Sequence, residues 1–393
     1  MTELLRRLGS PLPTRLATGF LLGLAAWLWP PVWGLILPAL SPYVAVGSTI
    51  ALRSVSLASI ASVPMLLVAV FCRRFWCRRL CPVGLISEYC GRVRAGSIQR
   101  NTPQSFAPAL PVSRVIVFAT LGGALAGYPF LLWLDPLALF SGAFNLSRAA
   151  VHGVTLLSVA GLPVVMFISV LFPGIWCSRI CPLGATQDLL ALVARRLNAG
   201  FPGAALPARR AVLTVGVGAA FSALVPKAWA GRQRYLRPPG NVDETAFKGG
   251  CIRCGSCVRA CPTGIIQPVV DPSDVSGFLA PTLRFSGADY CLQDCNRCGK
   301  ACPTKVIRQL SLEEKNRHVI GIARIDLSKC LLTLEKECGV CLPRCPRGAI
   351  VEGFAYDTYT VTVKVLPDKC NGCGACVGIC PAKVVTIDPG SHR

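Results

Sequence analysis

The chain has 393 residues, of which 52% are hydrophobic and 15% are charged, and its formal net charge is +22. Because an average soluble domain is about 25% charged, this composition argues against an ordinary soluble enzyme and against a disordered tail. A large positive charge is typical of nucleic-acid binding, or of membrane proteins, which concentrate Lys and Arg on one side. The high hydrophobic content favours a membrane, and we expect no nucleic-acid partner.

Long charge-free runs in the first part of the chain predict membrane spans. The runs are residues 17–52, 54–72, 115–134, 149–178 and 211–226. A helix needs about 20 apolar residues to cross a bilayer, so we expect an α-helical membrane bundle of four or five spans, in contact with lipid. The Arg-rich loops predict a cytoplasmic N-terminus, with the end of the chain on the outer side of the membrane. Buried core helices are the alternative.

The last run follows an arginine pair, Arg209 and Arg210, and its end is followed by the small-residue sequence Ala228-Trp229-Ala230. This pattern is similar to a twin-arginine export signal with a cleavage site. An ordinary last helix is the alternative, and cleavage after Ala230 stays open. We therefore divide the chain into a membrane domain (residues 1–200), a signal-like fifth span (201–230) and a third domain (231–393).

The third domain holds sixteen cysteines in four runs, each ending before a proline. They are Cys251, Cys254, Cys257 and Cys261; Cys291, Cys295, Cys298 and Cys302; Cys330, Cys338, Cys341 and Cys345; and Cys370, Cys373, Cys376 and Cys380. In the bacterial ferredoxin pattern, three consecutive cysteines bind one [4Fe–4S] cube and the fourth binds a neighbouring cube. Zinc sites lack the third cysteine and the C-P ending. We predict four [4Fe–4S] clusters in an α+β domain of two bacterial-ferredoxin-like halves.

The spacing does not specify which runs exchange their fourth cysteine. The first and fourth runs follow the regular ferredoxin spacing, whereas the second and third lengthen the first gap. This difference favours pairing the first run with the fourth and the second with the third. Pairing of adjacent runs is the alternative.

Two shorter motifs repeat in the apolar part with a period of 100 residues, at residues 76–82 and 176–182. Each reads W-C-x-x-x-C-P, which predicts duplication of a two-helix unit. Together they supply four thiolates, enough for a further [4Fe–4S] cluster, from Cys77, Cys81, Cys177 and Cys181. Half the ligands of two clusters, two structural cysteine pairs and a transient dithiol pair are alternatives.

A few single residues in the apolar part have open roles. Cys72 and Cys90 have no counterparts in the second repeat and are interpreted as free buried thiols. His152 is a candidate for quinone contact or proton transfer, although a lone histidine there is more often without function. Asp135 and Asp188 are ambiguous. No residues form a hydrolytic or group-transfer constellation, so any catalysis is quinol oxidation or reduction, and the assignment as an enzyme stays open.

The motifs resemble those of two subunits of periplasmic nitrate reductase systems. Residues 1–200, with their two W-C-x-x-x-C-P-x-G motifs, resemble the membrane ferredoxin-type subunit of the NapH type. Residues 205–393, with the arginine pair and four cluster motifs, resemble the exported ferredoxin-type subunit NapG and its methylamine-utilisation relative MauM. The chain thus looks like a fusion of the two subunits.

The resemblance implies a membrane-bound electron-transfer protein similar to a quinol dehydrogenase, in a bacterial inner membrane with its N-terminus in the cytoplasm and its ferredoxin domain in the periplasm. It would pass electrons between the quinone pool and a periplasmic redox protein, such as a cytochrome c or a reductase. Its cofactors would be [4Fe–4S] clusters and a quinone. The alternative is an accessory or maturation factor of the MauM or MauN type, which supplies electrons for assembly of a periplasmic dehydrogenase. A redox sensor is disfavoured because the chain shows no DNA-binding or signalling module.

Overall fold

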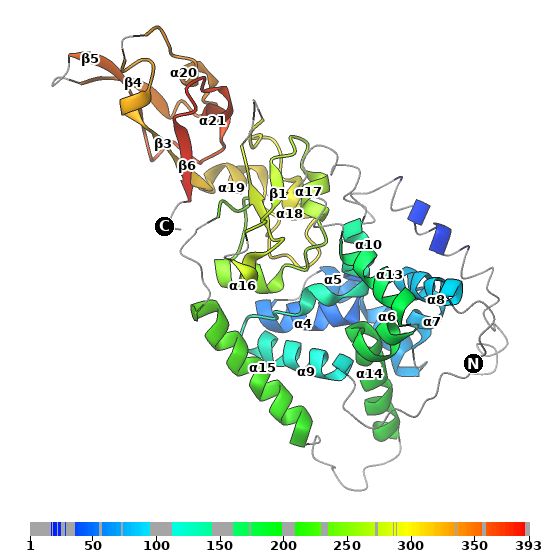
Figure 1. Ribbon diagram of the computed structural model, residues 1–393. Helices are drawn as coiled ribbons and strands as arrows, with labels where there is room; N and C mark the ends of the chain where they lie inside the picture. Colours follow the sequence, from blue (N-terminus) through cyan, green and yellow to red (C-terminus); the bar gives the residue numbers. More distant parts are fainter. Residues whose placement is uncertain are drawn as a thin grey trace.

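The computed structural model describes residues 36–54, 57–71, 74–94, 112–143, 160–172, 174–198, 209–228, 235–271, 274–285, 287, 289–334, 336–355 and 359–389, with scattered positions between 17 and 28. Helices gather at one end of the molecule, and the strand pair of β4 (Ile350–Ala355) and β5 (Thr360–Val365) lies at the opposite end (Figure 1). The two ends correspond to the apolar and the cysteine-rich parts of the sequence.

The helical part is built from short helices. These are α4 (Pro42–Leu52), α5 (Leu57–Ala61), α6 (Val63–Phe71), α7 (Phe75–Arg79), α8 (Pro82–Arg94), α9 (Val112–Leu125), the 3-10 helix η1 (Leu132–Leu134), α10 (Pro136–Ala143), α13 (Gly161–Leu171), the π-helix η2 (Trp176–Ile180), α14 (Pro182–Asn198) and α15 (Arg209–Ala228). Polar caps begin two of them. The Ser41 side chain accepts a hydrogen bond at the start of α4, and the Asp135 carboxylate accepts two backbone N–H groups of α10 at 3.0 Å. Such caps satisfy N–H groups that the helix leaves unpaired.

The charge-free runs 54–72 and 115–134 do not form long helices, whereas run 211–226 lies within the 20-residue helix α15. Run 54–72 is divided between α5 and α6, and α9 ends at Leu125, just before a turn at Gly127. The 11 residues of α13 extend only about 16 Å, against about 30 Å of hydrocarbon in a bilayer. Among the described residues, no helix combines the length and the apolar character needed to cross a membrane. The predicted membrane bundle and the inner-membrane localisation are therefore wrong, because lack of charge did not distinguish an unbroken helix from short helices separated by turns.

The two W-C-x-x-x-C-P repeats have matching elements that pack crosswise. Each repeat is a helix, a short helix and a longer helix: α6–α7–α8 in the first and α13–η2–α14 in the second. Helix α13 contacts α8, and α6 contacts α14. The Oγ atoms of Ser87 and Ser169 lie 2.8 Å apart across the first contact, and Arg74 binds Asp188 at 2.6 Å across the second. The crosswise packing places both cysteine motifs in one buried core.

The cysteine-rich part alternates short helices with antiparallel strand pairs. Its elements are α16 (Glu244–Gly250), α17 (Ser256–Ala260), β1 (Ile266–Pro268), η3 (Val275–Gly277), β2 (Pro281–Leu283), α18 (Arg297–Lys300), α19 (Leu312–Arg317), β3 (Gly321–Ile325), η4 (Leu327–Lys329), α20 (Cys341–Arg344), β4 (Ile350–Ala355), β5 (Thr360–Val365), α21 (Ala375–Ile379) and β6 (Val385–Pro389). The pairs are β1–β2, β3–β6 and β4–β5. Strand β3 precedes the third cysteine run and β6 follows the fourth, so their pairing encloses both runs in one half.

Candidate iron–sulfur sites

Three cavities in the cysteine-rich part are each lined by four cysteines, three from one run and the fourth from the adjacent run. We number each site by the run that supplies three. Site 1 is lined by Cys251, Cys254, Cys257 and Cys302; site 2 by Cys291, Cys295, Cys298 and Cys261; and site 4 by Cys370, Cys373, Cys376 and Cys345. Adjacent runs therefore exchange their fourth cysteines, and the favoured pairing of the first run with the fourth is wrong.

Site 3 has the same composition. Its four cysteines are Cys330, Cys338, Cys341 and Cys380. Burial raises the pKa of Cys341, and negative charge at the other three cysteines raises it further, so all four lie within electrostatic range. The third and fourth runs thus form a pair like that of the first and second.

The fourth cysteine of every run begins the same turn. The backbone N–H of the residue three positions later donates to the carbonyl oxygen of the cysteine, and that residue has a positive φ. The N···O distance and φ are 3.4 Å and 71° at Gly264, 3.4 Å and 57° at Lys305, 3.1 Å and 56° at Gly348, and 3.1 Å and 53° at Lys383. The proline after the cysteine fixes its own φ, and the left-handed residue closes the turn. Four equivalent turns give the four exchanged cysteines equivalent surroundings.

The donor set at these sites fits a [4Fe–4S] cluster. Burial raises the pKa of Cys298 to about 12 and those of Cys291 and Cys302 to about 11, and coordination to a metal deprotonates such thiols. Among the described residues, no three His, Cys, Asp or Glu side chains are placed to share a single metal ion. In a cube each thiolate binds a different iron, so its ligands stand further apart than those of one zinc ion.

The four cysteines of the helical part also lie together, and we call them the tetrad: Cys77, Cys81, Cys177 and Cys181. Cys81 and Cys181 are buried in the same cluster of side chains. Burial raises the pKa of Cys181, and negative charge at the other three thiols raises it further. The N–H of Cys81 donates to Trp76 O at 2.9 Å and that of Cys181 to Trp176 O at 2.8 Å. This spacing of five residues is that of a π-helix, which is frequent at functional sites.

Polar atoms around the tetrad indicate a further group between the repeats. Trp76 Nε1 and Trp176 Nε1 are buried and have no hydrogen-bond partner among the described residues. Gln187 Nε2 donates to Cys77 Sγ at 3.2 Å. Buried N–H groups are rarely left unpaired, so two indole donors at equivalent positions fit a group that offers sulfur acceptors. A [4Fe–4S] cube on the four thiolates would do so.

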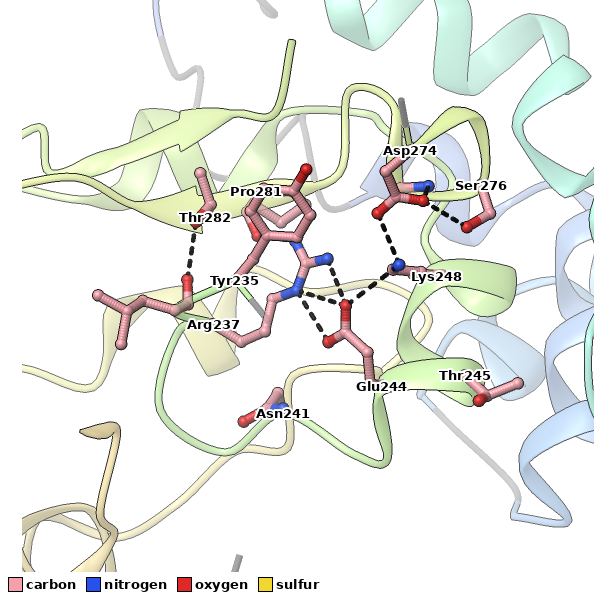
Figure 2. Close-up of polar contacts among 12 residues, drawn as sticks. Tyr235, Arg237, Asn241, Glu244, Thr245, Lys248, Asp274, Ser276, Pro281 and Thr282 are labelled. Atoms are coloured by element: carbon pink, nitrogen blue, oxygen red, sulfur yellow. Dashed lines mark hydrogen bonds and ion pairs between the residues drawn. The ribbon is translucent and has the colours of Figure 1, made fainter. Parts of the chain in front are cut away.

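An ion network of three buried side chains and the partly exposed Glu244 holds the start of the first run (Figure 2). Arg237 donates to both carboxylate oxygens of Glu244, with a shortest distance of 2.6 Å, and to Pro281 O at 2.7 Å. Lys248 donates to Asp274 at 2.6 Å, with both side chains buried. Burial alone would raise the pKa of Asp274, but hydrogen bonds from Lys248, from the Ser276 hydroxyl and from the backbone N–H of Gly277 lower it. The network fixes α16, whose C-cap residue is Cys251.

The remaining residues from the sequence analysis have structural roles or lie outside the description. Asp135 caps α10 and Asp188 binds Arg74. Cys72, His152 and Ala230 lie outside the described residues, and the side chain of Cys90 is not described. The sequence analysis missed Gln187, whose contact with Cys77 joins the two repeats and has no signal in the motif.

Comparisons with known proteins agree with these sites. The family described as "4Fe-4S binding domain" matches residues 57–101 and 154–200, which contain the two tetrad motifs. Families described as "4Fe-4S dicluster domain" match residues 250–306, 290–349 and 322–381. Ferredoxin-like 4Fe–4S domains are therefore present, and the chain binds several [4Fe–4S] clusters. No solved structure matches the chain.

Relatives identify the family. The chain is 31% identical over 174 residues to the methylamine utilization ferredoxin-type protein MauM of Methylobacillus flagellatus, which covers 42% of this chain and 72% of MauM. It is 33% identical over 156 residues to the ferredoxin-type protein NapF of Haemophilus influenzae, covering 39% of this chain and 78% of NapF. The chain belongs to this ferredoxin-type family.

The ferredoxin-type protein NapG of Escherichia coli is a further relative, 34% identical over 155 residues, or 37% of this chain. The chain spans only 65% of the length of NapG. As a member of this ferredoxin-type family, the protein is an iron–sulfur protein related to NapG and MauM.

Proposed function

We propose that the protein passes electrons along five cysteine sites, each holding a [4Fe–4S] cluster, in the order tetrad, site 1, site 2, site 4 and site 3. The first step is supported by packing between the two parts. Tyr43 and Val44 of α4 lie in one buried cluster with Ile252 and Cys254 of site 1. Negative charge at Cys181 of the tetrad is among the causes that raise the pKa of Tyr43, after its burial. The side chains of α4 thus lie between the tetrad and site 1.

The junction between the two cysteine-rich halves supports the step from site 2 to site 4. The backbone N–H of Cys291 donates to the carbonyl oxygen of Cys373 at 2.9 Å. Asn371 Nδ2 donates to Gln293 Oε1 at 3.3 Å beside it. This backbone hydrogen bond therefore joins a cysteine of site 2 directly to a cysteine of site 4.

The chain's own residues hold and shield the sites. An iron–sulfur cluster supplies single-electron chemistry over a wide range of potentials. Burial of Cys251, Cys254 and Cys257 excludes water from site 1. Hydroxyls of Thr263 and Thr304 lie 3.5 and 3.7 Å from the sulfurs of Cys261 and Cys302. Hydrogen bonds to ligand sulfur raise a cluster's potential, so these hydroxyls contribute to the potentials of sites 1 and 2.

The donor and acceptor follow from the resemblance to NapH-type subunits. It supports a quinol as the electron donor at the tetrad and a separate redox protein as the acceptor at site 3. A quinol would give up two electrons and release two protons to water, and a chain of one-electron sites would pass the electrons on singly. The observation that carries the proposal is the series of contacts that joins neighbouring sites: the α4 side chains beside site 1, the exchanged cysteines within each half, and the hydrogen bond between Cys291 and Cys373.

Anaerobic purification with iron and sulfide analysis tests the number of sites. About 20 irons per chain support five cubes, and about 16 contradict a cluster at the tetrad. The iron-loaded protein is then mixed with a soluble quinol analogue and followed by EPR. Reduction at a rate that falls in a Cys77→Ala variant supports quinol as donor at the tetrad. Reduction by dithionite but by no quinol would contradict that donor.

An accessory role is the second candidate, supported by the 31% identity to MauM over 72% of its length. In that case the protein would supply electrons for the assembly of another redox protein. Reduced clusters that are reoxidised by an immature partner, and not by its mature form, would favour this function.

A further inference from the structure

A buried arginine links site 1 to the helical part. Arg259 lies on α17, between the third and fourth cysteines of the first run, and is 6% exposed. One guanidinium nitrogen, Nη1, donates to the carbonyl oxygen of Ser141 at 2.5 Å, and Nη2 donates to Ser141 Oγ at 3.0 Å. Ser141 is itself buried in α10. The arginine thus reaches out of the cysteine-rich part to a fixed position on the helices.

The same guanidinium lies beside the ligands of site 1. Its Nη2 donates to Ser256 Oγ at 3.3 Å, and that oxygen lies 3.3 Å from Cys254 Sγ. Burial lowers the pKa of Arg259, whereas the thiolates of Cys254 and Cys257 raise it. An arginine keeps its charge at any ordinary pH, and an isolated buried charge costs several kcal/mol. The thiolates of site 1 offset that cost.

The other runs have no such charge at the equivalent position. The second residue after the third cysteine is Arg259 in the first run, Lys300 in the second, Pro343 in the third and Gly378 in the fourth. Lys300 is exposed, so water screens its charge. Among these four positions, a buried positive charge occurs only at site 1.

We propose that Arg259 is a positioning residue that raises the reduction potential of site 1 and fixes this site against α10. The inference rests on the proposed function, because site 1 must hold a [4Fe–4S] cluster. Reduction adds a negative charge to the site. A fixed positive charge in a low-dielectric interior stabilises that added charge, and its bonds to Ser141 keep it at one distance. Site 1 would therefore accept electrons from the tetrad more readily than it would without Arg259.

An EPR-monitored redox titration of the full iron-loaded chain tests the proposal. The signal lost in a Cys254→Ala variant identifies site 1. We expect Arg259→Gln to lower the equilibrium constant for reduction of site 1 at least tenfold, which is 59 mV for one electron. Arg259→Lys keeps the charge and should retain most of the potential. Lys300→Gln is the matched change in the second run. It should leave the equilibrium constant for reduction of every site within a few-fold of its wild-type value.

Iron content separates the possible failures. A wild-type chain without iron at site 1 contradicts the proposed function itself. An Arg259→Gln variant with full iron and unchanged potentials overturns the role of Arg259 and leaves the proposed function standing. An equal loss in Arg259→Lys would also overturn it, because the charge is kept. If Arg259→Gln does not bind iron, Ser141→Asp decides, since its carboxylate neutralises Arg259 in place: a lower potential supports the proposal and an unchanged one overturns it.

Discussion

Asp135 is a buried carboxyl with a complete set of hydrogen bonds. Ser41 Oγ donates to it at 2.6 Å, and the N–H groups of Leu137 and Ala138 donate at 3.0 Å. Burial raises the pKa of Asp135 to about 6, although these hydrogen bonds oppose the rise. The hydrogen bonds of the cap therefore stabilise the charged form of Asp135, whereas burial destabilises it.

The stability of the protein should depend on this carboxyl between pH 4 and pH 7. Because the pKa of Asp135 is higher in the folded than in the unfolded state, its contribution is largest below the unfolded pKa and is lost as the pH rises through about 6. The loss is on the order of 2 kcal/mol, since a tenfold change in proton affinity is worth about 1.4 kcal/mol. Urea unfolding followed by circular dichroism at pH 4 and pH 7 measures it. Asp135→Asn should remove this part of the pH dependence, and equal dependence in both proteins would contradict the assignment.

The candidate cluster ligands could be predicted from the sequence, whereas the residues that contact them could not. All twenty cysteines of the motifs follow from spacing, because cluster ligands need fixed residue types at fixed separations. Arg259 and Gln187 have no such pattern. Their positions beside cysteines depend on how distant elements pack, as with Ser141, which lies 118 residues from Arg259 in the chain.

At the scale of the secondary-structure elements, glycines let helices α9 and α15 approach each other closely. A Cβ at Gly122 would collide with the carbonyl oxygen of Val215, and one at Gly218 with that of Ala119. The helices lie side by side along this contact (Figure 1). The small residues of both helices are therefore part of a helix–helix contact.

Gly218→Ala should therefore destabilise the protein by about 1–3 kcal/mol, the usual cost of overpacking. Gly216 lies on the same helix with nothing within 4 Å of its added Cβ. Gly216→Ala is the matched control and should stabilise by up to about 1 kcal/mol through helix propensity. Urea unfolding midpoints of the two variants provide the comparison. Similar shifts in both would show that the two helices do not approach as closely as described.

The exchange of cysteines between adjacent runs gives a second prediction at this scale. Cys302 belongs to the second run but lines site 1, whereas Cys298 lines site 2. Cys302→Ala should thus perturb the same EPR signal as Cys254→Ala, and Cys298→Ala a different one. Iron analysis of each variant is the control for loss of folding. A shared signal for Cys302→Ala and Cys298→Ala would contradict the exchange.

The arrangement of elements was only partly predictable. The 100-residue repeat indicated two equivalent units, and α8 and α14 do begin at the prolines after Cys81 and Cys181. The charge-free runs misled, because composition does not record where turns divide a run. The crosswise packing of α13 on α8 and of α6 on α14 was also not predictable, since it depends on tertiary contacts between the repeats.

At the scale of the whole molecule, charge agrees with the content of the cysteine-rich part. Residues 231–393 carry 22 basic and 15 acidic side chains. A [4Fe–4S] cube with four thiolates carries about −2 when oxidised, so four cubes add about −8 and nearly neutralise this part. The remaining excess of positive charge lies in residues 1–230, which have 19 basic and 4 acidic side chains.

The order of the sites predicts which clusters affect one another magnetically. Two reduced clusters broaden each other's EPR signals when they lie close together. Sites 2 and 4 meet at the backbone hydrogen bond between Cys291 and Cys373. Removing site 4 with Cys370→Ala should sharpen the signal of site 2 and leave that of site 1 nearly unchanged. Removing site 3 with Cys338→Ala is the matched control and should leave sites 1 and 2 unchanged, because site 4 lies between them. A change at site 1 but not at site 2 in the Cys370→Ala protein would contradict the linear order and require a different path through the molecule.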